Sequence, residues 1–281
     1  MHLIEQAERS GTFTIAGVVT SEPDCRDLEQ VAARRVPVVQ HDIHAFYASR
    51  SARLTRDWQT RELYDEATLA ILRGFEPDIV LLDGYLYLLT ARVLDAFPNR
   101  LLNLHFSDLT MREADARPTF PGIRAVRDAI VAGECETFAT VHLVNQEPDG
   151  GPPLLRSWAF PVSPLVSRAR TWQAADMLKA YAYAHQEWML RDASGPLLDA
   201  AVHLVTSGRV SLDALALQPP HTTIPWTIEA NGELRPPSVS PHAAGTVPQQ
   251  RGSRRRECRR PWTSGRSSSD TRAAAREGRV R

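Results

Sequence analysis

Short apolar runs alternate along the chain with longer amphipathic segments, and this alternation constrains the fold more than any other feature. The apolar runs predict strands at 13–20, 36–39, 78–83, 100–106, 137–144 and 154–162. The segments with helical spacing predict helices at 2–9, 25–34, 60–73, 121–132, 174–190 and 197–205. Strands that alternate with helices form parallel sheets. We therefore expect an α/β fold, with a doubly wound, mostly parallel sheet covered by helices on both faces.

The sequence changes character near residue 218. Residues 218–281 are rich in proline, serine and arginine and lack periodicity, so we expect a disordered tail after an α/β domain at 1–217. Residues 251–281 hold eleven arginines and three acidic residues, which gives +8; because the whole chain is formally neutral, residues 1–250 carry −8. An acidic domain argues against nucleic-acid binding.

The cysteines, at 25, 135 and 258, show no metal-type spacing. An odd number fits a reduced cytosol better than a disulfide framework. The N-terminus lacks a basic region followed by an apolar run, and no stretch approaches 18 apolar residues. Neither a signal peptide nor a membrane span is therefore expected. These features favour a cytoplasmic protein and leave its oligomeric state open.

Two polar residues interrupt the apolar strand at 100–106. Asn103 and His105 are two positions apart, so their side chains leave the same face, near the strand end where α/β sheets bind ligands. Asp149 comes later, in a turn with two glycines and a proline. An amide, an imidazole and a carboxylate can stabilise an oxyanion and move one proton. Each alone also fits a structural role: local hydrogen bonding, core packing or turn formation.

Other polar and aromatic residues suggest weaker alternatives. His142 is interpreted as a core histidine that orients the site. His41 and His44 could indicate a metal site, but no further ligand lies at a useful spacing, so no metal is expected. Tyr85 and Tyr87 fit a pocket wall or packing better than acid–base chemistry.

Six short motifs, in their order and spacing, resemble the formyltransferases that use 10-formyltetrahydrofolate, in particular those of purine biosynthesis. The resemblance covers about residues 3–212. The motifs are Arg61-Glu-Leu-Tyr-Asp65, Asp83-Gly-Tyr-Leu-Tyr-Leu-Leu89, Leu102-Asn-Leu-His105, Pro121-Gly-Ile-Arg124, Thr140-Val-His142 and Asp149-Gly-Gly-Pro152.

This resemblance implies a one-carbon transferase that moves a formyl group from 10-formyltetrahydrofolate to a primary amine of a small acceptor. It assigns catalysis to Asn103, His105 and Asp149. It assigns the folate pocket to Arg61, Leu86, Tyr87, Leu89 and Asp149, although Arg61 could instead be a charge on a helix surface. Glu187, in the pair Gln186 and Glu187, would contact the ribose of the acceptor.

Three departures from the family pattern bear on this expectation. The family begins with a central strand and a Gly-Ser-Asn loop that binds the acceptor's phosphate, whereas this sequence starts within the following helix. The family's His-Pro-Ser is His105-Phe-Ser107 here, and the segment 108–117 is longer and more charged. We expect the strands at 13–20 and 78–83 to have unpaired edges as a result.

The acceptor favoured by the resemblance is glycinamide ribonucleotide. Transfer to tRNA would need a nucleic-acid-binding second domain, which residues 218–281 are not expected to form. Hydrolysis of formyltetrahydrofolate is less favoured, because no regulatory domain precedes the core. An amino sugar stays open as an alternative acceptor. An inactive relative of the family is the alternative of another class.

Overall fold

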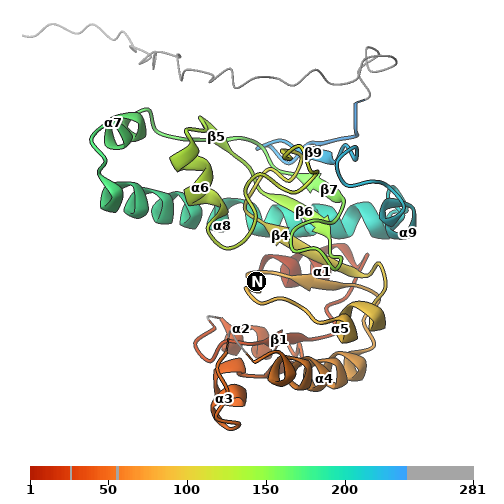
Figure 1. Cartoon of the computed structure of the whole chain (residues 1–281). Coiled ribbons are helices and arrows are strands. Elements are labelled where there is room, and N and C mark those ends of the chain that lie inside the picture. Colours follow the sequence, from red (N-terminus) through yellow and green to blue (C-terminus); the bar gives the residue numbers. More distant parts are fainter. Residues whose placement is uncertain (26, 55–56, 239–281) are drawn as a thin grey trace, which may run out of the picture.

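The computed structural model describes residues 1–25, 27–54 and 57–238. Within them, six strands form a sheet in the order β10-β9-β7-β6-β4-β3, and Figure 1 shows α8 running across this sheet. Helices packed on a central sheet confirm the predicted α/β class. The strands are β3 Val80–Leu82, β4 Leu101–His105, β6 Thr140–Leu143, β7 Pro153–Arg156, β9 Trp226–Ile228 and β10 Leu234–Arg235.

The sheet is mixed, so the expectation of a mostly parallel sheet is wrong. β3 and β4 pair in parallel, but β4 with β6 and β6 with β7 pair antiparallel. The connection between β6 and β7 is only residues 144–152, and a connection this short joins antiparallel strands, whereas a parallel crossover needs a dozen residues or more. Beside them, β5 Glu136–Thr137 and β8 Phe160–Pro161 form a two-stranded sheet of their own.

Helix α8 is one continuous helix, where the sequence predicted two. It spans Ala175–Thr206 and contains Pro196. A proline inside a helix costs about 3 kcal/mol, but α8 buries apolar side chains on both sides of it, including Met189 and Leu197. Gly195 lets α1 approach closely here, because a Cβ would lie 2.7 Å from the ring of His2 and would force that side chain to shift. The other helices are α1 His2–Ser10, α2 Leu28–Ala33, α3 Ile43–Ala48, α4 Trp58–Phe75, α5 Ala91–Ala96, α6 Ala125–Ala132, α7 Leu165–Thr171 and α9 Leu212–Ala216.

The apolar interior has two parts. The larger core joins β4, β6 and β7 to α6 and α8. A smaller core gathers Ile43, Tyr47 and Tyr64 from α3 and α4, with Tyr87 packed against it. We call β1, β2, α2 and α3 the small lobe.

The small lobe contains a separate sheet. β1 Val18–Thr20 pairs in parallel with β2 Val38–Gln40. Among the described residues, β1 pairs with β2 alone and β3 with β4 alone, as expected for strands with unpaired edges. The side chains of Val18, Val80 and Leu81 are accordingly only half-buried.

The predicted tail begins as ordered structure. Residues up to 238 include β9, which pairs with β7 in parallel, and β10, which pairs with β9. Ile228 on β9 is buried in the larger core. The expectation of disorder from 218 is therefore wrong for 218–238, because a three-residue strand can add to a sheet edge without the periodicity that sequence patterns detect. Residues 239–281 lie outside the described residues.

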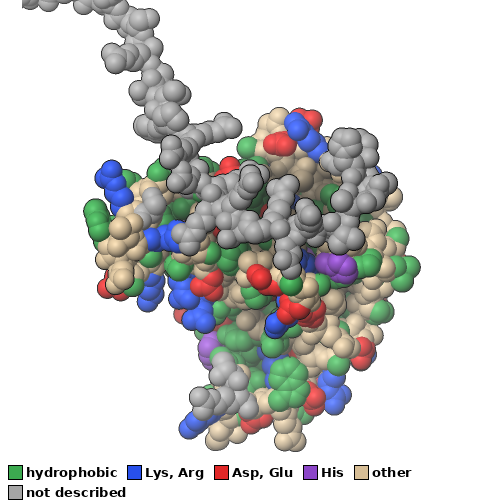
Figure 2. Space-filling model, turned by 45° about the horizontal axis from the view of Figure 1, so that its top comes forward, with side chains coloured by type: hydrophobic (Ala, Val, Ile, Leu, Met, Phe, Trp, Pro, Cys, Tyr) green, Lys and Arg blue, Asp and Glu red, His purple; other side chains and the backbone are tan. Residues whose placement is uncertain are grey.

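The described surface mixes charges. On the face in Figure 2, basic and acidic side chains lie interspersed. No helix in the described ranges is long and apolar enough to cross a membrane.

Candidate functional site

Strand β4 brings Asn103 and His105 into the middle of the sheet. Its apolar residues are buried on both sides, and its neighbours are β3 and β6. Asn103 lies opposite His142 of β6, and His105 lies opposite Thr140. Directly opposed residues share a face of the sheet, so these four side chains leave the same face.

His142 fixes the orientation of the Asn103 amide. Its ring is buried, and its Nδ1 lies 3.1 Å from the Leu143 carbonyl oxygen, to which only a protonated nitrogen can donate. Burial lowers the pKa of His142 to about 4, aided by the nearby His105, so the ring is neutral near pH 7 and its Nε2 is an acceptor. Asn103 Nδ2 donates to that Nε2 over 3.1 Å, which leaves its second N–H for another partner.

His105 has an oxygen beside each ring nitrogen. Nδ1 lies 3.5 Å from Asp149 Oδ1, and Nε2 lies 3.4 Å from the Phe120 carbonyl oxygen. Both are long contacts. A doubly protonated imidazole could donate to both oxygens.

The turn that carries Asp149 is tightly constrained. Asp149 has a left-handed backbone with φ 53°, and its Oδ2 accepts a hydrogen bond of 2.7 Å from the Gly122 N–H. Position 151 accommodates only glycine, because a Cβ there would lie 1.7 Å from the Leu143 carbonyl oxygen. The structure therefore brings Asn103, His105 and Asp149 together, with His142 between them; its Nε2 lies 3.8 Å from Asp149 Oδ1.

Arg61 lies inside the fold, so the alternative of a helix-surface charge is wrong. Its Nη2 is 2.7 Å from Asp65 Oδ1 and also donates to the Tyr85 hydroxyl. Asp65 Oδ2 accepts from the Thr90 N–H at 2.6 Å. Burial raises the pKa of Asp65, and the facing Arg61 opposes that shift. Arg61 Nε and Nη1 are buried without a hydrogen-bond partner among the described residues, and folate contact by Arg61 stays a prediction.

The loop after β3 alternates between inward and outward side chains. Tyr85 and Tyr87 are half-buried, whereas Leu86 and Leu88 are exposed. The Tyr87 hydroxyl donates to Glu22 Oε1 over 2.8 Å. Exposed apolar side chains here could contact a flat ring system, and Leu89, which is half-buried, lies deeper in the same loop.

Gln186 and Glu187 lie on α8, where Gln186 is half-buried and Glu187 is exposed. The hydrogen bonds and ion pairs found within the described ranges do not join them to Asn103, His105 or Asp149. Sequence reasoning also missed two backbone groups of the site, the Phe120 carbonyl and the Gly122 N–H. The Pro-Gly turn at 121–122 is the one signal that could have indicated them.

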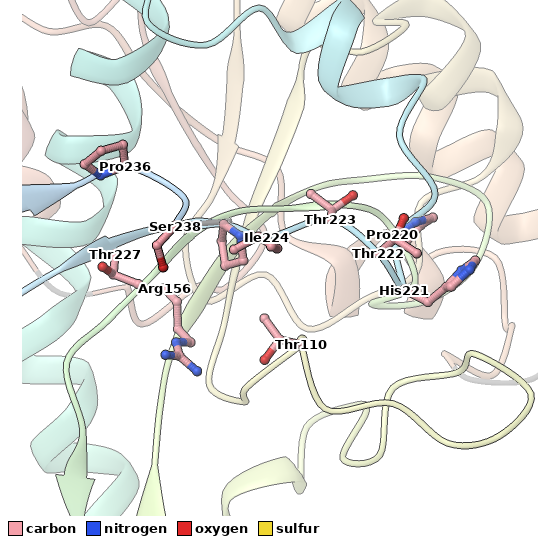
Figure 3. A pocket seen from close by; sticks show the side chains of 11 residues that line it. Thr110, Arg156, Pro220, His221, Thr222, Thr223, Ile224, Thr227, Pro236 and Ser238 are labelled. Carbon is pink, nitrogen blue, oxygen red and sulfur yellow. The ribbon is translucent and has the colours of Figure 1, made fainter. Parts of the chain in front are cut away.

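Figure 3 shows a separate hollow of about 360 Å³. It borders β7, which β6 separates from β4, the strand that carries His105. Arg156 of β7 lines it and lies 2.8 Å from Asp108 Oδ2. The Thr140 hydroxyl donates to the Ser107 carbonyl and so ties the segment after β4 to β6. The full lining is Thr110, Arg156, Pro220, His221, Thr222, Thr223, Ile224, Pro225, Thr227, Pro236 and Ser238.

Comparison with known proteins assigns the family. The sequence profile described as formyl transferase matches residues 1–177, more than half of the chain. The chain belongs to the formyl transferase family. The resemblance inferred from the six motifs is thereby confirmed.

The similar curated proteins carry two names. Phosphoribosylglycinamide formyltransferase of Escherichia coli K12 is 28% identical over 144 residues, 51% of this chain and 58% of that protein. The phosphoribosylglycinamide formyltransferase of Mycobacterium tuberculosis H37Rv is 35% identical over 129 residues, which are 46% of this chain and 51% of that protein. Formyltetrahydrofolate deformylase of E. coli K12 is 28% identical over 151 residues, which are 54% of this chain and 45% of that protein. This family member thus spans about half the length of the curated relatives it matches.

A solved structure agrees with the fold. Glycinamide ribonucleotide transformylase 1 from Symbiobacterium toebii superposes with a TM-score of 0.51 at 28% identity, covering 75% of this chain and 83% of that one.

Proposed function

We propose that this protein transfers a formyl group from 10-formyltetrahydrofolate to a primary amine of a small acceptor, with glycinamide ribonucleotide as the first candidate. The observation that carries the proposal is the convergence of Asn103, His105 and Asp149 beside a neutral His142. The names of the relatives support the same chemistry.

In the proposed reaction, the amine nitrogen attacks the formyl carbon and forms a C–N bond, while the carbonyl electrons move to oxygen. The free N–H of Asn103 donates to this oxyanion, and so does the Nε2–H of a protonated His105, which gives up its long contact with the Phe120 carbonyl; one such donor is typically worth about 10²–10³ in rate. The oxyanion then collapses and the bond to the folate nitrogen breaks. Asp149, beside His105, helps to move the amine proton to that departing nitrogen.

Hydrolysis of formyltetrahydrofolate is a second candidate, favoured by the similarity to deformylases. The two differ in what attacks the formyl carbon, water or an amine. Release of tetrahydrofolate, measured with and without glycinamide ribonucleotide, separates them: transfer needs the amine, whereas hydrolysis does not. Turnover that appears only with an amino sugar would change the acceptor and keep the reaction class.

The site residues are tested by substitution. Asn103→Ala and His105→Ala are each expected to slow formyl transfer at least about 10²-fold, with folate affinity nearly unchanged, because both donors act on the transition state. His203→Ala, which alters an exposed histidine on α8, is the matched control and should keep the wild-type rate. Equal losses of binding and rate would contradict the proposed roles. Wild-type protein that neither turns over nor binds 10-formyltetrahydrofolate would contradict the function itself.

A further inference from the structure

The segment between β4 and the Pro-Gly turn folds into a small hairpin. Arg112 and Pro118 form an isolated antiparallel bridge. The Glu113 N–H donates to the Arg117 carbonyl at 2.9 Å, and the Thr119 N–H donates to the Met111 carbonyl at 3.0 Å. This hairpin lies in the long, charged segment that distinguishes the sequence from the family pattern.

Arg112 joins this hairpin to the turn that carries Asp149. Its Nε donates to the Leu109 carbonyl at 3.1 Å and its Nη1 to the Ala116 carbonyl at 3.1 Å. Nη1 also reaches the Gly150 carbonyl at 3.4 Å, and Nη2 reaches the Gly151 carbonyl at 3.3 Å. One guanidinium thus contacts four backbone oxygens, two in the hairpin segment and two in the turn after Asp149. A planar fork with five donors can do this, whereas a lysine ammonium on its flexible stem cannot match the geometry.

Two of the four contacted carbonyls belong to Gly150 and Gly151, the residues that follow Asp149. Asp149 has a left-handed backbone, which aspartate tolerates better than most residues with a side chain, and contacts from two other segments hold this turn. The Gly122 N–H holds the carboxylate itself, and Arg112 holds the backbone next to it. The Arg112 side chain is half-buried where it makes these contacts, and this burial lowers the pKa of its guanidinium.

We propose that Arg112 is a positioning residue for the reaction, which sets the place of the Asp149 carboxylate beside His105 by holding the Gly150 and Gly151 carbonyls. This inference rests on the proposed function. A displacement of about 1 Å at a catalytic group can cost up to 10²-fold in rate, so a residue that touches no reacting atom can still control the rate through this turn.

The test is a double-mutant cycle between Arg112 and Asp149. Arg112→Gln is expected to lower kcat about 10- to 100-fold, with KM for the folate changed less. In an Asp149→Asn background the same change should cost less than about threefold, because residues that act through one another are not additive. Arg117→Gln is the matched control: Arg117 lies in the same hairpin with an exposed side chain paired to Asp115, and its loss should leave kcat within about twofold.

The outcomes separate positioning from stability. Equal losses from Arg112→Gln in both backgrounds would overturn the proposal, and so would a loss no larger than that of Arg117→Gln. Arg112→Lys keeps the charge and serves if the glutamine variant does not fold; a wild-type kcat for a folded Arg112→Lys would also overturn the proposal.

A second measurement needs no turnover. The ring resonances of His105, read by NMR at one pH, should shift in the same direction in Asp149→Asn and in Arg112→Gln, and should stay in place in Arg117→Gln. Wild-type protein that neither turns over nor binds 10-formyltetrahydrofolate would contradict the proposed function, while this shift still decides whether Arg112 holds Asp149 at His105. Unchanged His105 resonances in Arg112→Gln would refute that link.

Discussion

The buried, neutral His142 makes the free energy of unfolding depend on pH. Burial and the nearby His105 lower the pKa of His142 from 6.5 to about 4. Between these two values the unfolded chain binds a proton that the folded chain does not, so the stability from this group is full above pH 6.5 and falls as the pH falls. From pH 7 to pH 5 the loss is about 2 kcal/mol, since one pKa unit corresponds to about 1.4 kcal/mol.

Urea unfolding at several pH values between 7 and 5, followed by tryptophan fluorescence, measures this loss. His142→Gln keeps an acceptor for Asn103 and a donor for the Leu143 carbonyl but does not titrate, so its stability should fall by about 2 kcal/mol less than that of the wild type over this range. His203→Gln, exposed on α8, should keep the wild-type pH dependence. Equal pH dependence in the wild type and His142→Gln would refute the assignment of a neutral, buried imidazole.

Two further predictions concern the turn and the C-terminal strands. Gly151→Ala should destabilise the fold by about 1–3 kcal/mol, because the added Cβ would meet the Leu143 carbonyl oxygen, whereas Gly74→Ala in open space on α4 should stabilise it by about 0.5–1 kcal/mol. Thermal melting of both variants checks this pair of predictions. A Gly151→Ala protein as stable as the wild type would argue against the close approach of residue 151 to the Leu143 carbonyl oxygen. A chain ending at Gln218 should melt at a lower temperature than one ending at Ser238, because it loses the strand that pairs with β7; equal melting temperatures would show that β9 adds no stability.

The candidate site could be predicted because it depends on local patterns. Asn103 and His105 share a strand face by the two-residue period, and β4 is apolar enough to be placed in the sheet from sequence alone. The turn at Asp149 is encoded by its own glycines. The order of the motifs then indicated that these two segments meet, as they do in the structure.

Other features depend on distant partners that no local pattern contains. Arg61 looks like an exposed helical residue until Asp65, Tyr85 and the surrounding side chains bury it. Pro196 is a strong helix breaker in isolation, but the apolar side chains around it are buried in the larger core, and that packing overrides the local preference. The direction of β6 and the addition of β9 are set by tertiary pairing, which single-segment periodicity does not report.

The separate two-stranded sheet of the small lobe has a consequence for how the molecule opens. Strands β4 and β6 are paired on both edges and buried, whereas, among the described residues, β1 pairs on one edge alone and its Val18 and Val19 are only half-buried. Units with few shared contacts open independently and at lower free energy. The amides of Val18–Thr20 and Val38–Gln40 should therefore exchange with deuterium earlier than those of β4 and β6. A free energy of unfolding measured from amide exchange in the central sheet would then describe that part of the molecule alone. The small lobe would unfold locally in a separate equilibrium.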